Sequence, residues 1–354
     1  MIQGKNILVV GTGLIGTSVA LGLTAQGFNV FLSDIDPTAL DDALKVSGAT
    51  KYSDQDVSVV VVATPPASTA KVIAAAVLEH PLAVVTDVAS VKGSIFRELE
   101  ELGSTNWDRI VGGHPMAGRE VSGAIGAQGN LFLDRPWVIA SSDRTSANAV
   151  ATVKELVESL GAFPVFRTIE EHDRAVALIS HTPQVVASVL AGELMDAEGS
   201  YIELAGQGIR DTIRIAGSDS NLWTEILSEN SEFISQQVTA VANHLLEFAG
   251  ALESGNRESV TARLVKGNQG RDRLPGKHGS SHQTTALLVV RLDDKPGELA
   301  RLFTVAAQTE VNLEDVRIDH SLGHPTGLVE LTVAPTSIQM LKPALEAEGF
   351  VVIS

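Results

Sequence analysis

The side chains best suited to chemistry stand in three separate stretches of the chain. His114 follows a glycine pair in VGGHPMAGRE, Ser90 stands in TDVASVKG, and GQGIRDTIRIAGSD carries Arg210 and Arg214. An imidazole with an ordinary pKa of about 6.5 can take up a proton near neutral pH, and a hydroxyl can orient the group that releases it. A guanidinium can hold a carboxylate through two parallel hydrogen bonds. Together these groups suit the oxidation of an anionic alcohol.

Each of these groups also has a purely structural explanation. A histidine beside a proline often serves as a hydrogen-bonding residue of the fold, and Ser90 could cap the helix that follows it. Arg210 and Arg214 would repel each other at helix positions i and i+4 unless an anion lies nearby, and Asp211 could take one of them. His181, in LISHTPQVVAS, lies in an apolar helical stretch where a core histidine is the simpler interpretation.

A glycine-rich loop near the N-terminus predicts a dinucleotide site. The segment VVGTGLIGTS follows an apolar strand, opens an Ala- and Leu-rich helix, and has the spacing G-x-G-x-x-G. Gly11 permits a tight turn, Gly13 lets the backbone approach a pyrophosphate, and Gly16 allows close helix-to-strand packing. Leu14 and Ile15 stand between the last two glycines, at the start of the helix that faces the phosphates.

The acidic residue after the second strand favours NAD over NADP. Asp34 lies about 20 residues beyond the loop, where a carboxylate can accept both ribose hydroxyls and repel a 2′-phosphate. Asp36 adds to that repulsion, and no arginine occurs between positions 17 and 50. Asp34 could also be only a solvated residue at a strand end. Thr64 and Pro65, in ATPP, end a later strand beneath the expected cofactor, although ordinary loop chemistry explains them equally well.

The elements that must position these residues follow from the hydrophobic pattern. Seven apolar runs alternate with Ala-rich helical stretches: NILVVG, NVFLSD, VSVVVVAT, LAVVTDVA, RIVGGHP, WVIASS and FPVFR. This alternation predicts a doubly wound, Rossmann-type α/β domain over residues 1–168, with His114 and Ser90 at the carboxyl edge of a parallel sheet. Residues 169–262 show helical periodicity, and their long apolar helices predict a homodimer that covers the remaining apolar face.

The amino-acid composition and hydrophobic pattern change twice within the last 90 or so residues. Residues 263–283 are basic and rich in Gly, Ser and Pro, which predicts a linker, with a basic anion-binding strip as the alternative. Residues 284–354 show the order β-α-β-β-α-β, which predicts a ferredoxin-like domain.

Composition limits the kinds of partner and chemistry. The 354 residues carry a formal net charge of −17, which disfavours binding to nucleic acid and to anionic membranes. The chain has no cysteine, which excludes disulfides and thiol chemistry, and we expect no metal site. No apolar run reaches the roughly 18 residues of a membrane span, and the start reads as a strand and not as a signal peptide. A cytoplasmic protein is expected.

Taken in order, several of these motifs resemble the prephenate and arogenate dehydrogenase family of tyrosine biosynthesis. The motifs are GTGLIGTS, Asp34, DVASVKG, GGHPMAG, SHTPQ, IRDTIRIAGSD, LW and Asn230. The resemblance implies a catalytic role for His114, assistance from Ser90, and a substrate pocket that His181 and Arg214 line.

The sequence departs from the family pattern at two places. Gln207 interrupts a run that is commonly three glycines, and Ile213 stands where many members have threonine. The resemblance therefore does not extend to the family's close substrate contacts at these two positions.

The resemblance also implies a reaction and an effector. The reaction is the NAD-dependent oxidative decarboxylation of prephenate to 4-hydroxyphenylpyruvate, with His114 as general base; the same chemistry on L-arogenate, which gives tyrosine, is the alternative. From about residue 284, DDKPGELARLF and VNLEDVRI resemble an ACT domain, a module that often binds amino acids. This predicts that L-tyrosine binds between paired ACT domains, with Gly297 and Asn312 as contacts, and lowers activity, although Pro296 and Gly297 could simply form a turn.

Two other functions remain as alternatives. A β-hydroxyacid dehydrogenase also joins a Rossmann domain to helices, but its catalytic lysine would fall in residues 170–262, which contain none. A non-catalytic amino-acid sensor is the second alternative. Asp34, His114 and Arg214, all present here, argue against a sensor.

Overall fold

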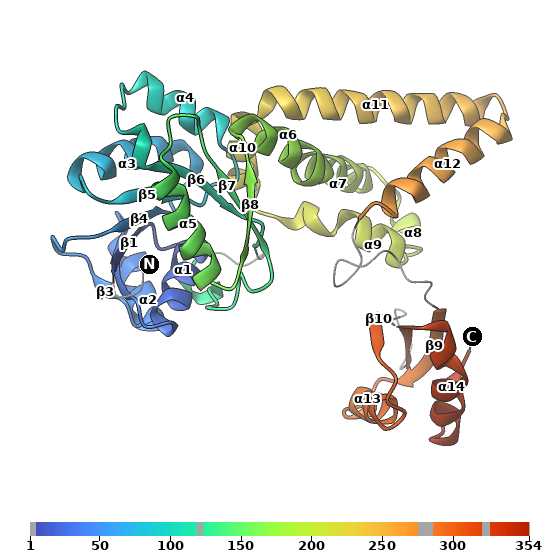
Figure 1. Ribbon diagram of the computed structural model, residues 1–354. Coiled ribbons are helices and arrows are strands. Elements are labelled where there is room, and N and C mark those ends of the chain that lie inside the picture. Colours follow the sequence, from blue (N-terminus) through green and yellow to red (C-terminus); the bar gives the residue numbers. More distant parts are fainter. Residues whose placement is uncertain (1–4, 119–122, 275–285, 321–325, 354) are drawn as a thin grey trace. The chain divides into compact units, whose positions relative to one another are not determined.

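The computed structural model describes residues 5–118, 123–274, 286–320 and 326–353 (Figure 1). The chain divides into two compact units, residues 1–243 and 244–354, which we describe separately.

The first unit opens with a mainly parallel sheet. Its strands are β1 (Asn6–Val10), β2 (Asn29–Ser33), β3 (Thr50–Lys51), β4 (Val59–Val62), β5 (Val84–Asp87), β6 (Ile110–Pro115), β7 (Pro136–Ala140) and β8 (Phe163–Arg167). They lie in the order β3-β2-β1-β4-β5-β6-β7-β8, whose first six strands have the 3-2-1-4-5-6 order of a Rossmann fold. All seven apolar runs predicted as strands form strands. The sequence analysis missed only β3, because two polar residues carry no hydrophobic period.

The direction of β7 differs from the expected all-parallel sheet. β6 and β7 are antiparallel, with Gly112 opposite Ala140 and His114 opposite Val138. The described part of their connection holds only one short 3-10 turn, Ala124–Gly126, and no α-helix. A parallel strand requires a crossover connection, whereas an antiparallel strand can follow a simple loop. The strand predictions were therefore right in place, and the expectation that all strands run parallel was wrong for this pair.

Helices cover both faces of this sheet (Figure 1). They are α1 (Leu14–Ala25), α2 (Pro37–Ser47), α3 (Pro66–Glu79), α4 (Gly93–Glu101) and α5 (Ala147–Ser159). Side chains alternate between the faces along each strand. Accordingly, Ile7 and Val9 pack with α1, α2 and α5, whereas Leu8 packs with α3 and α4. Two separate apolar cores hold the sheet edges, and the loops that extend from them, in place.

A helical segment follows β8, as the periodicity predicted. It comprises α6 (Ile169–Val176), a π-helical turn (Ala177–His181), α7 (Thr182–Gly192), α8 (Gly199–Ile202), α9 (Gln207–Ile213), α10 (Ser220–Glu229) and α11 (Ser231–Glu253), with short 3-10 turns at Glu193–Met195 and Arg214–Gly217. Thr168 starts α6 with a capping box, since its hydroxyl accepts from the Glu171 backbone N–H and the Glu171 carboxylate accepts from the Thr168 N–H. Trp223 and Ile226 of α10 pack into the apolar core under α3 and α4.

One apolar stretch in this segment, Ile169–Met195, is long enough to cross a membrane by length and composition alone. It contains His172, Asp173 and His181, which are buried and hydrogen-bonded inside the first unit. We therefore interpret the stretch, whose most apolar window is 33% buried, as part of a folded domain.

The second unit shows that the predicted linker begins too early. Residues 263–271 belong to α12 (Arg257–Arg271), which Asn256 caps through the Ser259 N–H. Arg263 pairs with Glu247 at 2.9 Å, so it belongs to a helix-to-helix contact and not to a basic strip. The linker prediction was wrong here because polar and glycine residues on an exposed helix resemble loop composition. Residues 275–283 of the predicted linker lie outside the described residues.

The C-terminal part of the second unit has the predicted β-α-β-β-α-β order. Its elements are β9 (Ala286–Asp293), α13 (Glu298–Gln308), β10 (Leu313–His320), β11 (Thr326–Val333), α14 (Ile338–Ala347) and β12 (Val351–Val352), with a 3-10 turn at Pro335–Ser337. The sheet is antiparallel in the order β10-β11-β9-β12, which is a ferredoxin-like arrangement. Its core includes Val290 of β9, Leu302 of α13 and Leu341 of α14, all fully buried.

Candidate active site

The loop between β1 and α1 has the geometry of a phosphate-binding turn. Gly11 has φ +98°, and a Cβ there would lie 2.5 Å from the Ala63 carbonyl oxygen. A Cβ on Gly16 would lie 2.0 Å from the Gly11 carbonyl oxygen, so α1 packs tightly on the loop. A Cβ on Gly13 would meet nothing within 4 Å, and Gly13 directly precedes Leu14 at the start of α1. This open backbone at a helix N-terminus fits a pyrophosphate.

Two further segments border this loop. One carboxylate oxygen of Asp34 accepts from the Thr12 N–H at 2.6 Å and from the Thr12 hydroxyl at 2.7 Å, and the other accepts from the Asp36 N–H. Burial raises the pKa of Asp34, but the hydrogen bonds from Asp36 and Thr12 lower it more, so the carboxyl is ionised. Thr64 and Pro65 lie between β4 and α3, with Pro65 at the N-cap position of α3. Asp34 follows β2, and Thr64 and Pro65 follow β4, so these residues come from the two strands that flank β1.

The glycine pair before His114 is a steric requirement of the sheet. A Cβ on Gly113 would lie 2.3 Å from the Asp87 carbonyl oxygen, and a Cβ on Gly112 would lie 2.9 Å from the Lys92 side chain. His114 follows at the carboxyl end of β6, half-buried. The ends of β1, β4, β5 and β6 are neighbours and run parallel, so the glycine loop, Ser90 and His114 share one edge of the sheet.

The nearest partner of His114 is a second histidine. The Nδ1 atom of His114 lies 2.8 Å from Nε2 of His172, and the two rings meet edge to face. Nδ1 of His172 lies 2.7 Å from a carboxylate oxygen of Asp173. Both His172 and Asp173 are buried and belong to α6. The three side chains form one hydrogen-bonded chain that joins β6 to the helical segment.

Asp173 also holds the start of α4. Its two carboxylate oxygens accept from the backbone N–H groups of Lys92 at 2.9 Å and Gly93 at 2.7 Å. A Cβ on Gly93 would lie 2.7 Å from that carboxylate, which accounts for the glycine. Lys92 occupies the N-cap position, so Ser90 does not cap this helix and the capping explanation for it was wrong. Ser90 is half-buried between β5 and α4.

A buried ion pair supports the same region. The ammonium of Lys92 pairs with the carboxylate of Asp87, and both side chains are almost completely inaccessible to solvent. Asp87 also accepts from the Ala89 N–H at 2.8 Å. These bonds fix the loop between β5 and α4, which carries Ser90.

Burial keeps the histidines of the cluster neutral. It lowers the pKa of His114 well below its ordinary value, and the positive charge of nearby Lys92 acts in the same direction. Burial lowers the pKa of His172 although the Asp173 hydrogen bond opposes this. Burial raises the pKa of Asp173, but the hydrogen bonds from His172, Gly93 and Lys92 lower it more. At neutral pH the cluster therefore holds neutral imidazoles beside an ionised carboxylate.

His181 is a buried histidine with a defined partner. The amide nitrogen of Asn230 donates to the Asp173 carbonyl at 2.9 Å and lies 3.2 Å from Nδ1 of His181. Because that nitrogen is a donor, Nδ1 of His181 accepts and its Nε2 carries the proton. Burial lowers the pKa of His181 to about 4. Trp223 lies edge-on to its ring.

The two predicted arginines occupy exposed positions of the helical segment. Arg210 lies on α9 and Arg214 begins the following 3-10 turn, and both are exposed. Asp211 accepts from the amide of Gln207 at 2.7 Å. The turn and α9 pack against α7, the helix that follows His181.

Sequence reasoning missed His172 and Asp173. They lie 58 and 81 residues from the groups they bond, His114 and Lys92, so no local spacing reveals the contact. The one available signal was an adjacent His-Asp pair at the start of a long apolar helix.

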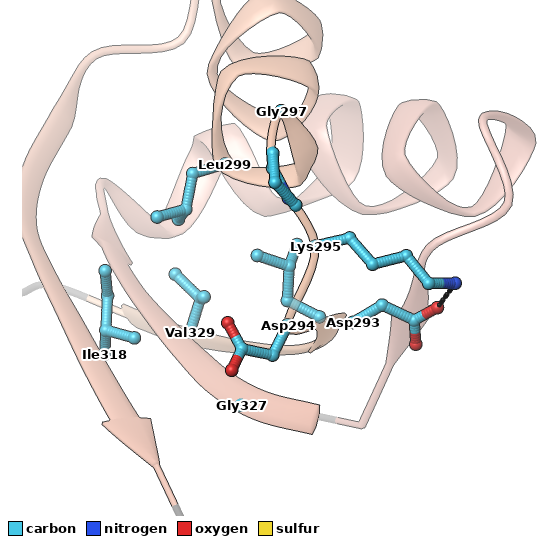
Figure 2. Close-up of a pocket in the computed structure, with 10 residues that line it drawn as sticks. Asp293, Asp294, Lys295, Gly297, Leu299, Ile318, Gly327 and Val329 are labelled. Carbon is cyan, nitrogen blue, oxygen red and sulfur yellow. Dashed lines mark hydrogen bonds and ion pairs between the residues drawn. The ribbon is translucent and has the colours of Figure 1, made fainter. Parts of the chain in front are cut away.

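The second unit contains a separate cavity beside the turn between β9 and α13 (Figure 2). Its volume is about 370 Å³. It is lined by Leu292, Asp293, Asp294, Lys295, Pro296, Gly297, Leu299, Ile318, Gly327 and Val329. Gly297, with φ +92°, caps α13 at the cavity. Asn312 is not among the lining residues of this cavity, and its amide donates to Glu314 at 2.7 Å.

A sheet of this order, with a glycine loop at its switch point and a half-buried imidazole at the same edge, defines a nucleotide-dependent dehydrogenase. Residues 19–165 match the family model "Prephenate dehydrogenase, nucleotide-binding domain", and residues 168–266 match "Prephenate dehydrogenase, dimerization domain". The chain belongs to the prephenate dehydrogenase family.

Named relatives agree with this assignment. The chain is 34% identical to the "Probable prephenate dehydrogenase NovF" of Streptomyces niveus, over 95% of this chain and 96% of the relative. It is 27% identical to the prephenate dehydrogenase of Bacillus subtilis, over 92% of this chain and 91% of the relative.

Solved structures match about three quarters of the chain. The prephenate dehydrogenase of Aquifex aeolicus, in complex with hydroxyphenyl propionate and NAD⁺, has a TM-score of 0.69 and 25% identity, covering 75% of this chain and 97% of that one. Arogenate dehydrogenase of Synechocystis has a TM-score of 0.66 and 28% identity, covering 76% of this chain and 99% of that one.

Proposed function

We propose that the chain is an NAD-dependent prephenate dehydrogenase, which converts prephenate to 4-hydroxyphenylpyruvate and CO₂ in tyrosine biosynthesis in the cytoplasm. The observation that carries this proposal is the neutral imidazole of His114 at the sheet edge that holds the glycine loop. Family membership supports the reaction, and the NAD⁺ complex of the Aquifex aeolicus enzyme supports the cofactor. L-Arogenate is the second candidate substrate, because the Synechocystis relative is an arogenate dehydrogenase.

The proposed chemistry needs one base. NAD, when bound, would supply the acceptor for the hydride that leaves C4 of the substrate. His114 takes the proton of the 4-hydroxyl as the C4–H bond breaks, and the O–H electron pair forms the carbonyl. The bond to the ring carboxylate then breaks, its electron pair enters the ring, CO₂ leaves, and the aromatic phenolate takes back a proton. Aromaticity drives this step, so the substrate provides its own electron sink.

The remaining predicted residues have binding roles in this proposal. Ser90 orients the 4-hydroxyl at the edge that carries His114. His181 offers its Nε2–H to the substrate, and Arg214 holds a carboxylate, with Arg210 one turn earlier adding positive charge. These groups would fix C4 against the nicotinamide.

The same proposal assigns the cofactor contacts. The backbone of Gly13, Leu14 and Ile15 faces the pyrophosphate, and Asp34 accepts from the ribose hydroxyls. The Asp34 oxygen that accepts from the Asp36 N–H has a second lone pair for a ribose hydroxyl, whereas the other oxygen already accepts two hydrogen bonds from Thr12. Thr64 and Pro65, between β4 and α3, would lie beneath the cofactor.

Initial-rate kinetics with each substrate and cofactor test the assignment. We expect reduced cofactor to form with prephenate, with kcat/KM at least about tenfold higher for NAD than for NADP, because Asp34 and Asp36 repel a 2′-phosphate. A higher kcat/KM with L-arogenate would select the second substrate. Equal or better kcat/KM with NADP would overturn the role of Asp34, and no turnover with either substrate would overturn the proposed function.

We further propose that the enzyme is a homodimer through its helical segment. Large apolar side chains are exposed along it, at Val189, Met195, Tyr201, Leu204, Leu222, Leu245, Leu246 and Leu252. A second copy is the simplest cover for so much apolar surface, and the match to a dimerization domain supports it. Sedimentation velocity at micromolar concentration should show twice the 37.2 kDa chain mass; a monomer at that concentration would contradict the proposal.

For the C-terminal unit we propose an ACT domain that binds L-tyrosine and lowers activity. The ferredoxin-like order and the cavity beside Gly297 support this proposal. Leu299, Ile318 and Val329 offer an apolar wall to an aromatic ring, and Asp294 offers a carboxylate to an ammonium group (Figure 2).

Filling this cavity should remove the inhibition. Allosteric coupling of this kind usually changes an apparent affinity by roughly 5- to 150-fold. We expect Ile318→Trp to abolish tyrosine inhibition in full-length enzyme with kcat unchanged, and Val351→Trp, an exposed position in β12 outside the cavity, to leave inhibition intact. Competitive inhibition by tyrosine that persists in Ile318→Trp would show that tyrosine acts as a product analogue at the active site.

A further inference from the structure

The base of the proposed reaction lies at the end of a buried hydrogen-bonded chain whose direction can be worked out. Asp173 is ionised and its carboxylate can only accept hydrogen bonds. It already accepts from the backbone N–H groups of Lys92 and Gly93, and its third neighbour is Nδ1 of His172 at 2.7 Å. Nδ1 of His172 must therefore carry a proton and donate it to Asp173.

This fixes the arrangement of the next bond. Burial keeps His172 neutral, so a proton on its Nδ1 leaves Nε2 with a lone pair. That lone pair faces Nδ1 of His114 at 2.8 Å, and the bond forms only if Nδ1 of His114 is the donor. Neutral His114 then carries its single proton on Nδ1, and its Nε2 has the free lone pair.

We propose that His172 is a positioning residue, which holds His114 in the tautomer whose Nε2 is free to accept the substrate proton. A second neutral tautomer, with the proton on Nε2, would leave His114 unable to act as a base from that atom. His172 also restrains the ring, since His114 is only half-buried whereas His172 is 1% exposed. This inference rests on the proposed role of His114 as base.

Histidine NMR of the ligand-free enzyme tests the tautomer without any assay of activity. Long-range ¹H–¹⁵N correlation spectra at neutral pH distinguish the protonated ring nitrogen from the unprotonated one. Comparison of wild type with His114→Asn assigns the signals of His114. We expect a proton on Nδ1 of His114 in wild type and a mixture of tautomers in His172→Leu. A proton on Nε2 of His114 in wild type would overturn the proposal.

Kinetics of two variants separate positioning from packing. In His172→Leu nothing accepts the Nδ1 proton, and we expect kcat to fall about 10- to 100-fold with KM for both substrates nearly unchanged. The loss should be smaller than the roughly 10⁴-fold seen when a base is held in the wrong tautomer, because here the tautomer is released and not reversed. In His172→Gln the amide oxygen can accept from His114 and the amide nitrogen can donate to Asp173, so most of the rate should return.

A histidine outside the cluster provides a matched control for His172→Leu. His80→Leu removes a half-buried histidine that packs on Tyr52 outside the cluster, and it should leave kcat unchanged. Equal losses in His172→Leu and His172→Gln, or normal kcat in both, would overturn the positioning role. If His114→Asn itself retains full activity, the proposed base is wrong whatever His172 does. The NMR result would still report the tautomer in that case.

Discussion

Asparagine at position 114 is expected to lower kcat by about 10²- to 10⁴-fold and to leave KM for prephenate and NAD nearly unchanged. The imidazole acts only as the 4-hydroxyl loses its proton, so its removal affects the transition state more than ground-state binding. Asparagine can keep a hydrogen bond to His172 at this half-buried position. Stopped-flow or steady-state rates of NADH formation measure the effect.

The acid limb of the pH profile provides an internal check. Burial and nearby Lys92 hold the pKa of His114 below its ordinary value, so the base stays neutral as the pH falls past that value. In wild type, kcat/KM should therefore decline only below about pH 6.5, as His114 takes up a proton. This limb should be absent in His114→Asn. A variant with normal kcat would return His114 to a structural role.

Replacement of Arg214 by alanine should raise KM for prephenate by roughly 30-fold or more. Truncation of one partner of a charge-assisted pair costs about 2 to 5 kcal/mol in a water-poor site. Arg214 is exposed in the single chain, so the lower end of that range applies. Since 1.4 kcal/mol is tenfold, about 2 kcal/mol corresponds to roughly 30-fold. Isothermal titration with a substrate analogue or initial-rate kinetics would measure it.

Two variants sharpen this experiment. Lysine at position 214 keeps the charge but loses the fork of parallel donors, so it should restore only part of the affinity. Arg167→Ala removes another exposed arginine, whose guanidinium donates to the Phe166 carbonyl, and should leave KM unchanged. Unchanged KM in Arg214→Ala, combined with a lower melting temperature, would assign Arg214 to a structural interaction.

Local patterns predicted the parts of this fold that depend on local chemistry. The apolar runs of β1, β2 and β4 to β8 and the tight turn at Gly11 have the expected geometry, because hydrophobic period and backbone sterics act within a few residues. The direction of β7 was missed, since it depends on what connects it to β6. The helix α12 was also missed, because an exposed helix without an apolar stripe looks like a linker.

The same distinction between local patterns and contacts of distant segments applies to the candidate active site. His114 and Ser90 could be placed at the sheet edge from strand order alone. The partners of His114 could not, because the contact between β6 and α6 depends on how two distant segments pack. Arg214 was predicted to bind the substrate from the residues around it in the sequence, and in the structure it is exposed.

The base and the groups that orient it come from different segments of the polypeptide. His114 belongs to the nucleotide-binding segment, whereas His172 and Asp173 belong to the first helix of the helical segment. Chimeric enzymes made by joining two family members near residue 168 would inherit the base from one parent and its support from the other. Only parents that agree at all three positions should yield active hybrids, so the two segments are constrained to change together as lineages diverge.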